Sequence, residues 1–174
     1  DEKDRIDFVS IATPNHTHAE IAQAALKAGF HVVCDKPMTN KIESARELVK
    51  TVEETGKIFA LTHNYTGYPM VRQAREIIGA GEIGDILAIR SSYIQGWLTT
   101  FDSTVPAARG VWKSDPTKAG SGSLGDIGTH AYNLLRFVTG LTVNKIAATT
   151  ESFHPTRAID DYGLIQMRMD NGAL

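Results

Sequence analysis

The sequence predicts an α/β fold in which a parallel sheet is followed by a second α/β segment. Two observations lead to this prediction. The first 62 residues alternate short β-branched runs with amphipathic helical runs, the order that produces parallel strands joined by right-handed crossovers. After Asn64 the pattern changes to longer strands and a long loop. We therefore expect two parts, residues 1–63 and residues 64–174.

Three strands and two helices are expected in the first part. The strands are expected at 7–12, 31–34 and 57–62, where apolar and β-branched residues gather. The helices are expected at 17–28 and at 40–56, because apolar residues recur there at helical spacing and a glycine follows each run. Asn40, with Glu43 three residues on, resembles a capping box that would begin the second helix.

The second part is expected to hold two helices and three strands. The helices are expected at 69–78 and at a segment that bears Asp126 and His130 and ends near Gly140. The strands are expected at 85–95, 143–152 and 163–169. The intervening loop, 96–122, contains both tryptophans, Trp97 and Trp112, and is too long to be only a connection.

The composition narrows the class of protein. Lys and Arg number 18 against 20 Asp and Glu, without a block of like charge, so neither nucleic acid nor an anionic membrane is expected as a partner. No apolar run approaches the roughly 20 residues that span a bilayer. The single cysteine, Cys34, excludes an internal disulfide and fits a reducing compartment, so we expect a cytoplasmic protein. Cys34 lies in an apolar run and is expected to be an inert core thiol rather than a nucleophile.

Asp126 and His130 form the most informative pair in the chain. They follow a glycine-rich approach, Gly120-Ser-Gly-Ser-Leu-Gly, and stand four residues apart at the start of an apolar helical run. Residues at this spacing lie on one helix face. A carboxylate there would orient the imidazole and favour its protonated form, which makes a proton-transfer group near neutral pH.

Two turns at the ends of predicted strands carry further polar residues. Thr13-Pro14-Asn15 follows the first strand and Asp35-Lys36-Pro37 follows the second. The carboxyl ends of parallel strands meet at one edge, where ligands bind. Lys36 is held extended by the following proline, and a fixed ammonium can stabilise negative charge on a reacting oxygen. The simpler interpretations are a helix-entry turn with an asparagine cap and a solvated lysine. His16 and His18 lack a third ligand, so no metal is expected.

Taken together, these motifs resemble the Gfo/Idh/MocA family of nicotinamide-dependent oxidoreductases. Thr13-Pro14-Asn15 with His18 looks like the family's Thr-Pro-Asn-x-x-His turn, and Asp35-Lys36-Pro37 looks like its Glu-Lys-Pro motif. The segment from Trp112 through Gly120-Ser-Gly-Ser-Leu-Gly-Asp-Ile-Gly-Thr-His130 looks like its substrate-domain signature. The departures from the family pattern are Asp35 for Glu, Ser121 within the glycine triplet, Asn133 where Asp is common and Thr66 where Arg is common.

The resemblance implies a fold, a reaction and partners. The fold would be the C-terminal part of a Rossmann-type parallel sheet followed by an α/β domain with an open, largely antiparallel sheet. The reaction would be hydride transfer between NAD or NADP and a hydroxyl or carbonyl of a sugar, an inositol or a related polyol. The second sheet would carry homo-oligomer contacts. An NAD-dependent glycoside hydrolase of the same family and a non-catalytic cofactor-sensing regulator remain as alternatives.

The resemblance also assigns roles to residues. His130 would be the acid/base, Lys36 would contact the reacting oxygen, and Asp126 would hold the substrate. The residues that would line the cofactor are Thr13, Pro14, Asn15, His18, Asp35, Lys36 and Asn64. The residues that would contact the substrate are Lys36, Trp112, Asp126 and His130.

Two further expectations follow from the resemblance. The family's first β-α-β unit, with its Gly-x-Gly-x-x-Gly phosphate loop, is absent from the chain as given. The chain begins on a strand and ends at Asn171-Gly-Ala-Leu174 like a hairpin turn without its return strand, so we expect a piece of a larger protein. Without the phosphate loop, this piece is expected to bind the cofactor poorly or not at all. Asp160 and Asp161, before the last strand, resemble an acidic site common in the family, and a solvated turn would explain them equally well.

Overall fold

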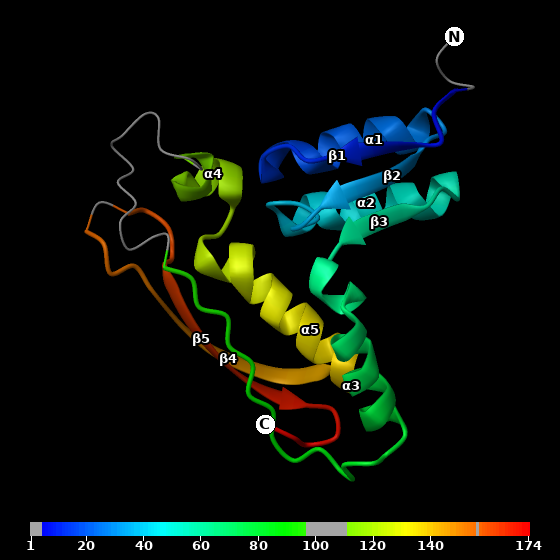
Figure 1. Ribbon diagram of the computed structural model, residues 1–174. Coiled ribbons are helices and arrows are strands. Elements are labelled where there is room, and N and C mark those ends of the chain that lie inside the picture. The colour runs from blue at the N-terminus through cyan, green and yellow to red at the C-terminus, as the bar shows by residue number, and fades with distance from the viewer. Residues whose placement is uncertain (1–4, 97–110, 156) are drawn as a thin grey trace. The chain divides into compact units, whose positions relative to one another are not determined.

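The computed structural model describes residues 5–96, 111–155 and 157–174 (Figure 1). These residues form two compact units. The first contains residues 5–62 and 111–121, and the second contains residues 63–96 and 122–174 apart from residue 156. The first unit therefore includes a segment that comes late in the sequence. The division into parts at residues 63 and 64 stays a prediction.

A three-stranded parallel sheet forms the centre of the first unit. Its strands β1 (Phe8–Ile11), β2 (His31–Asp35) and β3 (Phe59–Thr62) are ordered β1-β2-β3. All pairs are parallel, and the register sets Ile11 beside Cys34 and Asp35 beside Thr62. The predicted parallel sheet is confirmed, with β1 and β3 shorter than the runs that predicted them.

Helices α1 (His18–Lys27) and α2 (Ile42–Thr55) pack against each other and complete the core of the first unit. Ala22 and Leu26 of α1, Leu48 of α2 and Val32 of β2 are almost entirely buried in one cluster. Burial of apolar side chains at helical spacing is what orders these helices. Gly56 ends α2 in a left-handed conformation, with φ of 62°, and donates its N–H to the carbonyl of Val52.

The expected capping box at the start of α2 is wrong. The helix begins at Ile42 with Lys41 as its N-cap, and no side chain caps it. The Asn40 amide instead donates to the carbonyl of Thr117, at 3.1 Å. A distant main-chain acceptor has therefore replaced the local cap that the sequence pattern suggested.

The segment 111–121 folds with the first unit. It contains the short helices η5 (Val111–Ser114) and α4 (Pro116–Ala119), and the Asp115 carboxylate caps α4 by accepting from the Thr117 N–H at 2.9 Å. A Cβ built on Gly120, whose φ is +83°, would lie 2.6 Å from the Asn40 carbonyl oxygen. Most of the long loop expected at 96–122, residues 97–110 with Trp97, lies outside the described residues.

The second unit sets helices α3 (Pro69–Gly79) and α5 (Thr129–Thr139) side by side, with the guanidinium of Arg75 4.6 Å from the ring centroid of Phe137. Strands β4 (Val143–Glu151) and β5 (Tyr162–Met169) form an antiparallel pair (Figure 1). Both helices and both strands were expected at nearly these bounds, and the antiparallel pairing fits the implied second sheet. Over the described residues, no helix is both long enough and apolar enough to cross a membrane.

The strand expected at 85–95 is wrong. Residues 85–96 form no strand, and the main chain of Leu87 and Ile89 pairs with Leu174. Ile89 donates its N–H to the Leu174 carbonyl at 2.7 Å, and the Leu174 N–H donates to the Leu87 carbonyl at 3.2 Å. A strand needs a ladder of such bonds. Two bonds at Leu87 and Ile89 do not make a ladder, so the β-like side-chain pattern is not sufficient.

Cys34 is expected to react very slowly in the folded protein. Its side chain is fully buried, as the sequence predicted, and burial, with the nearby Asp35 charge, raises the pKa of the thiol to about 11. Because the thiolate is the nucleophile, iodoacetamide at pH 7.5 should label native Cys34 at least about 100-fold more slowly than the unfolded chain. Mass spectrometry of timed samples measures both rates. Equal rates would show that the thiol is accessible and reactive.

The stability of the loop before β5 is expected to depend on pH. Burial tends to raise the pKa of Asp161, but hydrogen bonds from the N–H groups of Phe153 and His154 and the Arg157 guanidinium outweigh it and hold that pKa below its usual range. Asp161 and Arg157 are joined at 2.6 Å with side chains only 8% and 5% exposed. The solvated turn is therefore excluded for Asp161.

A carboxyl whose pKa is lowered by folding stabilises the fold at any pH above its pKa in the unfolded chain. This contribution is lost as the pH falls through its pKa in the folded protein. Asp161→Asn should therefore cost about 3 kcal/mol of unfolding free energy at pH 7, since it leaves Arg157 buried without its charge partner. The difference from wild type should shrink as pH falls below about 4. Urea unfolding of both proteins from pH 7 to pH 3 measures it. A constant difference over that range contradicts the assignment.

Candidate functional site

The first unit brings two of the predicted turns to one edge of its sheet. Thr13 and Pro14 follow β1, and Lys36 and Pro37 follow β2. Because β1 and β2 are parallel and Ile11 lies beside Cys34, both turns leave the sheet at its carboxyl edge. This is the edge at which open α/β sheets bind ligands. The Lys36–Pro37 peptide bond is cis.

His18 joins these two turns. Its Nε2 lies 2.7 Å from the carbonyl oxygen of Thr13, and its Nδ1 lies 2.9 Å from the carbonyl oxygen of Pro37. The ring is 1% exposed. Both ring nitrogens are thus engaged with main-chain carbonyls, so His18 holds the turns in place. Its predicted contact with the cofactor stays a prediction.

Asn15 holds a third segment to the same edge. Its side chain is buried, and its amide donates to the carbonyl of Ala119 in α4 at 3.1 Å. It begins the short helix η2 (Asn15–Thr17), and no side chain caps either η2 or α1. The simpler interpretation of Asn15 as a helix cap is therefore wrong, because its amide donates a hydrogen bond to a carbonyl of a distant segment.

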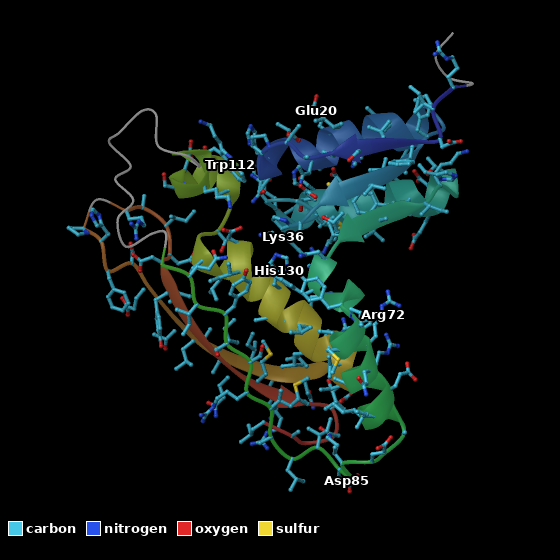
Figure 2. The ribbon with its side chains drawn as sticks, in the orientation of Figure 1. Glu20, Lys36, Arg72, Asp85, Trp112 and His130 are labelled. Carbon is cyan, nitrogen blue, oxygen red and sulfur yellow. The ribbon has the colours of Figure 1, made fainter. Side chains whose placement is uncertain are left out.

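The remaining predicted residues of the first unit lie near these turns or in 111–121. The Asp35 carboxylate accepts a hydrogen bond from the Thr62 hydroxyl at 2.8 Å, which ties the end of β2 to the end of β3. Thr13 is exposed, and its hydroxyl lies 2.6 Å from that of Thr17. Figure 2 shows Lys36 beyond β2 and Trp112 in the helical segment 111–119.

Asp126 and His130 lie at the start of the long helix of the second unit. The chain first makes a wide turn of π-helix, η6 (Leu124–Gly128), which contains Asp126, and then continues as α5, in which His130 is the second residue. Both side chains are half-buried. A uniform α-helix was expected here. The difference matters, because π-helical turns re-aim side chains and are frequent at functional sites.

An aromatic cluster surrounds His130, and the sequence did not reveal it. The ring centroid of His130 lies 4.8 Å from that of Tyr65, 5.8 Å from that of His63 and 6.1 Å from that of Tyr93. Tyr65 and His63 come from the turn after β3, which also contains Asn64 in the helix η3 (Asn64–Gly67). Tyr93 comes from the irregular segment 85–96. We call His63, Tyr65 and Tyr93 the aromatic cluster.

The two tyrosines of the aromatic cluster support each other. Their hydroxyl oxygens are 2.5 Å apart, and the Gln95 amide donates to the Tyr93 hydroxyl at 3.0 Å. The hydrogen bond with Tyr93 is the main cause that raises the pKa of Tyr65, and burial adds to it. Tyr65 therefore stays neutral at physiological pH. Edge-to-face packing of its ring against His130 restricts the orientation of the imidazole.

The predicted catalytic set is divided between the two units. Lys36 lies in the first, and Asp126 and His130 lie in the second. Their assembly into one site stays a prediction. Within the parts of the chain that the structure describes, no group of three or more His, Cys, Asp or Glu side chains could hold a metal ion.

Comparison with protein families identifies both parts of the chain. Residues 1–74 match the model of the "oxidoreductase family, NAD-binding Rossmann fold", and residues 71–174 match the model of the "GFO/IDH/MocA C-terminal domain".

Curated relatives include an uncharacterised oxidoreductase of Bacillus subtilis, 37% identical over 99% of this chain, and the levoglucosan dehydrogenase of Pseudarthrobacter phenanthrenivorans, 36% identical over 91% of this chain. D-glucoside 3-dehydrogenase of Escherichia coli is 32% identical over 80% of it. The chain spans 44%, 39% and 37% of the lengths of these three relatives.

Solved structures show the same likeness. An inositol dehydrogenase homologue from Azotobacter vinelandii, complexed with NAD+, superimposes with a TM-score of 0.87 at 33% identity, covering 97% of this chain and 44% of its own. Levoglucosan dehydrogenase with NADH and levoglucosan gives a TM-score of 0.86 at 35% identity, covering 97% of this chain and 46% of its own. The chain belongs to the GFO/IDH/MocA family of oxidoreductases, and its first part has that family's NAD-binding Rossmann fold.

Proposed function

We propose that the protein containing this chain is a dehydrogenase that transfers hydride between NAD or NADP and a hydroxyl–carbonyl pair of a sugar, an inositol or a related polyol. The observation that carries the proposal is the placement of His130. It stands at the start of α5, four residues after Asp126, with its ring enclosed by the aromatic cluster. A half-buried, oriented imidazole is suited to proton transfer near neutral pH.

The carboxyl edge of the parallel sheet fits a nicotinamide cofactor. Exposed Thr13 and the turn at Lys36 both leave the sheet there, and His18 fixes their main chains. The residues that would line the cofactor are Thr13, Pro14, Asn15, His18, Asp35, Lys36 and Asn64. When bound, the nicotinamide would accept hydride from the substrate carbon or return it.

The protein accepts the proton of the substrate hydroxyl. As the substrate alcohol becomes a carbonyl, a ring nitrogen of His130 takes the hydroxyl proton, and in the reverse direction it gives that proton back. The ammonium of Lys36 stabilises the negative charge that develops on the reacting oxygen. The carboxylate of Asp126 accepts hydrogen bonds from substrate hydroxyls and holds the ring in place, and Trp112 contributes a stacking surface.

The named relatives favour the dehydrogenase over its alternatives. Levoglucosan dehydrogenase and D-glucoside 3-dehydrogenase are named as dehydrogenases of sugars, not as glycoside hydrolases. A cofactor-sensing regulator would not need Lys36, Asp126 and His130, and all three are present. The proposal includes two further points. The sheet of β4 and β5 carries homo-oligomer contacts, and the protein is cytoplasmic.

Replacement of His130 is expected to abolish most of the activity. His130→Ala in the full-length protein should lower kcat by roughly two to four orders of magnitude, because the hydroxyl proton loses its acceptor. The measurement is the absorbance of reduced nicotinamide with a panel of sugars and inositols, levoglucosan and myo-inositol among them. His154→Ala, an exposed histidine of the same unit, is the control and should keep wild-type kcat. Unchanged turnover in His130→Ala overturns the acid/base role.

Replacement of Lys36 tests the other half of the site. Lys36→Met should lower kcat by roughly 100- to 1,000-fold, with a smaller change in KM, because the charge acts mainly on the transition state. Lys41→Met is the matched control, since Lys41 is an exposed lysine five residues on in the same unit. If both variants lose activity equally, or if Lys36→Met raises only KM, Lys36 does not stabilise the reacting oxygen.

A further inference from the structure

We propose that Asp160 is a positioning residue: its carboxylate fixes the π-helical turn that aims Asp126 and His130. The inference rests on the proposed function for its catalytic consequence, but its geometry stands independently. The Asp160 Oδ1 accepts the Gly122 N–H at 2.7 Å, and its Oδ2 accepts the Leu124 N–H at 2.8 Å and the Ser123 hydroxyl at 3.1 Å.

The main chain of Asp160 adds a further bond to the same turn. Its carbonyl oxygen accepts the Ser123 N–H at 2.9 Å. One residue therefore binds three consecutive N–H groups, those of residues 122–124, which are the groups that a helix start leaves without intrahelical partners. Asp126 depends on the same turn, because its N–H donates to the Gly122 carbonyl at 2.9 Å. A shift of the 122–124 backbone would thus be passed directly to Asp126.

Two glycines allow the backbones to come this close. A Cβ built on Gly122 would lie 1.8 Å from the Asp160 carbonyl oxygen, and one built on Gly163, in β5, would lie 2.3 Å from Leu124 Cδ2. Both distances are far shorter than any real Cβ contact. The helix start is therefore seated against the residues that begin β5, with no room for a Cβ at Gly122, whereas a Cβ at Gly163 would require the Leu124 side chain to move.

The loop that presents Asp160 is itself held firmly. Its neighbour Asp161 donates its N–H to the Glu151 carbonyl at 3.0 Å, and the Asp161 carboxylate is buried in an ion pair with Arg157. Asp160 is therefore a fixed anchor rather than a flexible turn residue. Its negative charge at the start of the helix is also electrostatically favourable. Asn cannot reproduce the arrangement, because an amide has one acceptor oxygen where Asp160 uses two.

Asp160→Asn in the full-length protein is the test. We expect kcat to fall about 10- to 100-fold with little change in KM, because a small misplacement of reacting groups lowers the rate steeply. Hydrogen exchange at the amides of 122–130 should become faster, and the NMR signals of the His130 ring should shift. Gly122→Ala, which pushes the same turn away from Asp160, should give the same three changes.

Asp170→Asn is the matched control. The Asp170 carboxylate also accepts from a main-chain N–H and a hydroxyl, both of Thr142, but at the far end of β5. It should leave kcat, exchange at 122–130 and the His130 ring signals as in wild type. If Asp160→Asn behaves like Asp170→Asn, the positioning role is refuted.

Further outcomes separate this inference from the proposed function. If wild type transfers no hydride to any substrate in the panel, the proposed function fails, while exchange at 122–130 and the His130 ring signals still decide the positioning role. If Asp160→Asn does not fold, Ser123→Ala removes one of the bonds to Asp160. Ser123→Ala should then lower kcat several-fold and shift the NMR signals of the His130 ring in the same way. An unchanged ring signal in that variant overturns the proposal.

Discussion

The first unit depends on one buried imidazole. His18 engages the carbonyls of Thr13 and Pro37, which belong to turns that follow different strands. Without it, a part-buried main-chain carbonyl at the edge of the sheet would lose its donor, which costs about 1 kcal/mol. The ladder of β1 and β2 aligns the two strand ends, and His18 links the turns beyond them. The placement of Lys36 thus follows from a residue that itself faces no solvent.

The second unit uses aspartates for a similar purpose. Asp160, Asp161 and Asp170 each accept main-chain N–H groups that belong to no helix or strand ladder. Main-chain N–H groups outside a helix or strand ladder take other acceptors, and a carboxylate can serve several at once. In this unit, acidic residues that a sequence reader would assign to the surface therefore determine where irregular segments run. The π-helical turn that leads into the helix of His130 begins among the residues whose N–H groups donate to the Asp160 carboxylate.

The sequence predicted the regular elements because burial leaves a periodic pattern. The strands of both sheets and helices α1, α2, α3 and α5 appear close to their expected bounds. The strand at 85–95 was mispredicted, because its side-chain pattern cannot report whether a neighbour supplies a ladder. The aromatic cluster was also missed, since Tyr65 and Tyr93 meet His130 only through tertiary packing. The four-residue spacing after a glycine-rich approach drew attention to Asp126 and His130, but the π-helical turn that carries Asp126 has no sequence signature.

The discontinuity of the first unit constrains how members of this family could be recombined. Residues 111–121 fold with 5–62, and the amides of Asn15 and Asn40 donate to carbonyls of Ala119 and Thr117. A chimaera joined once, after Thr62, would set both asparagines against a foreign segment. Two further crossovers, one before residue 111 and one after Gly120, keep the native segment with its own asparagines. Exchange of the second unit between relatives therefore calls for three junctions, and the last lies within the glycine-rich approach to His130.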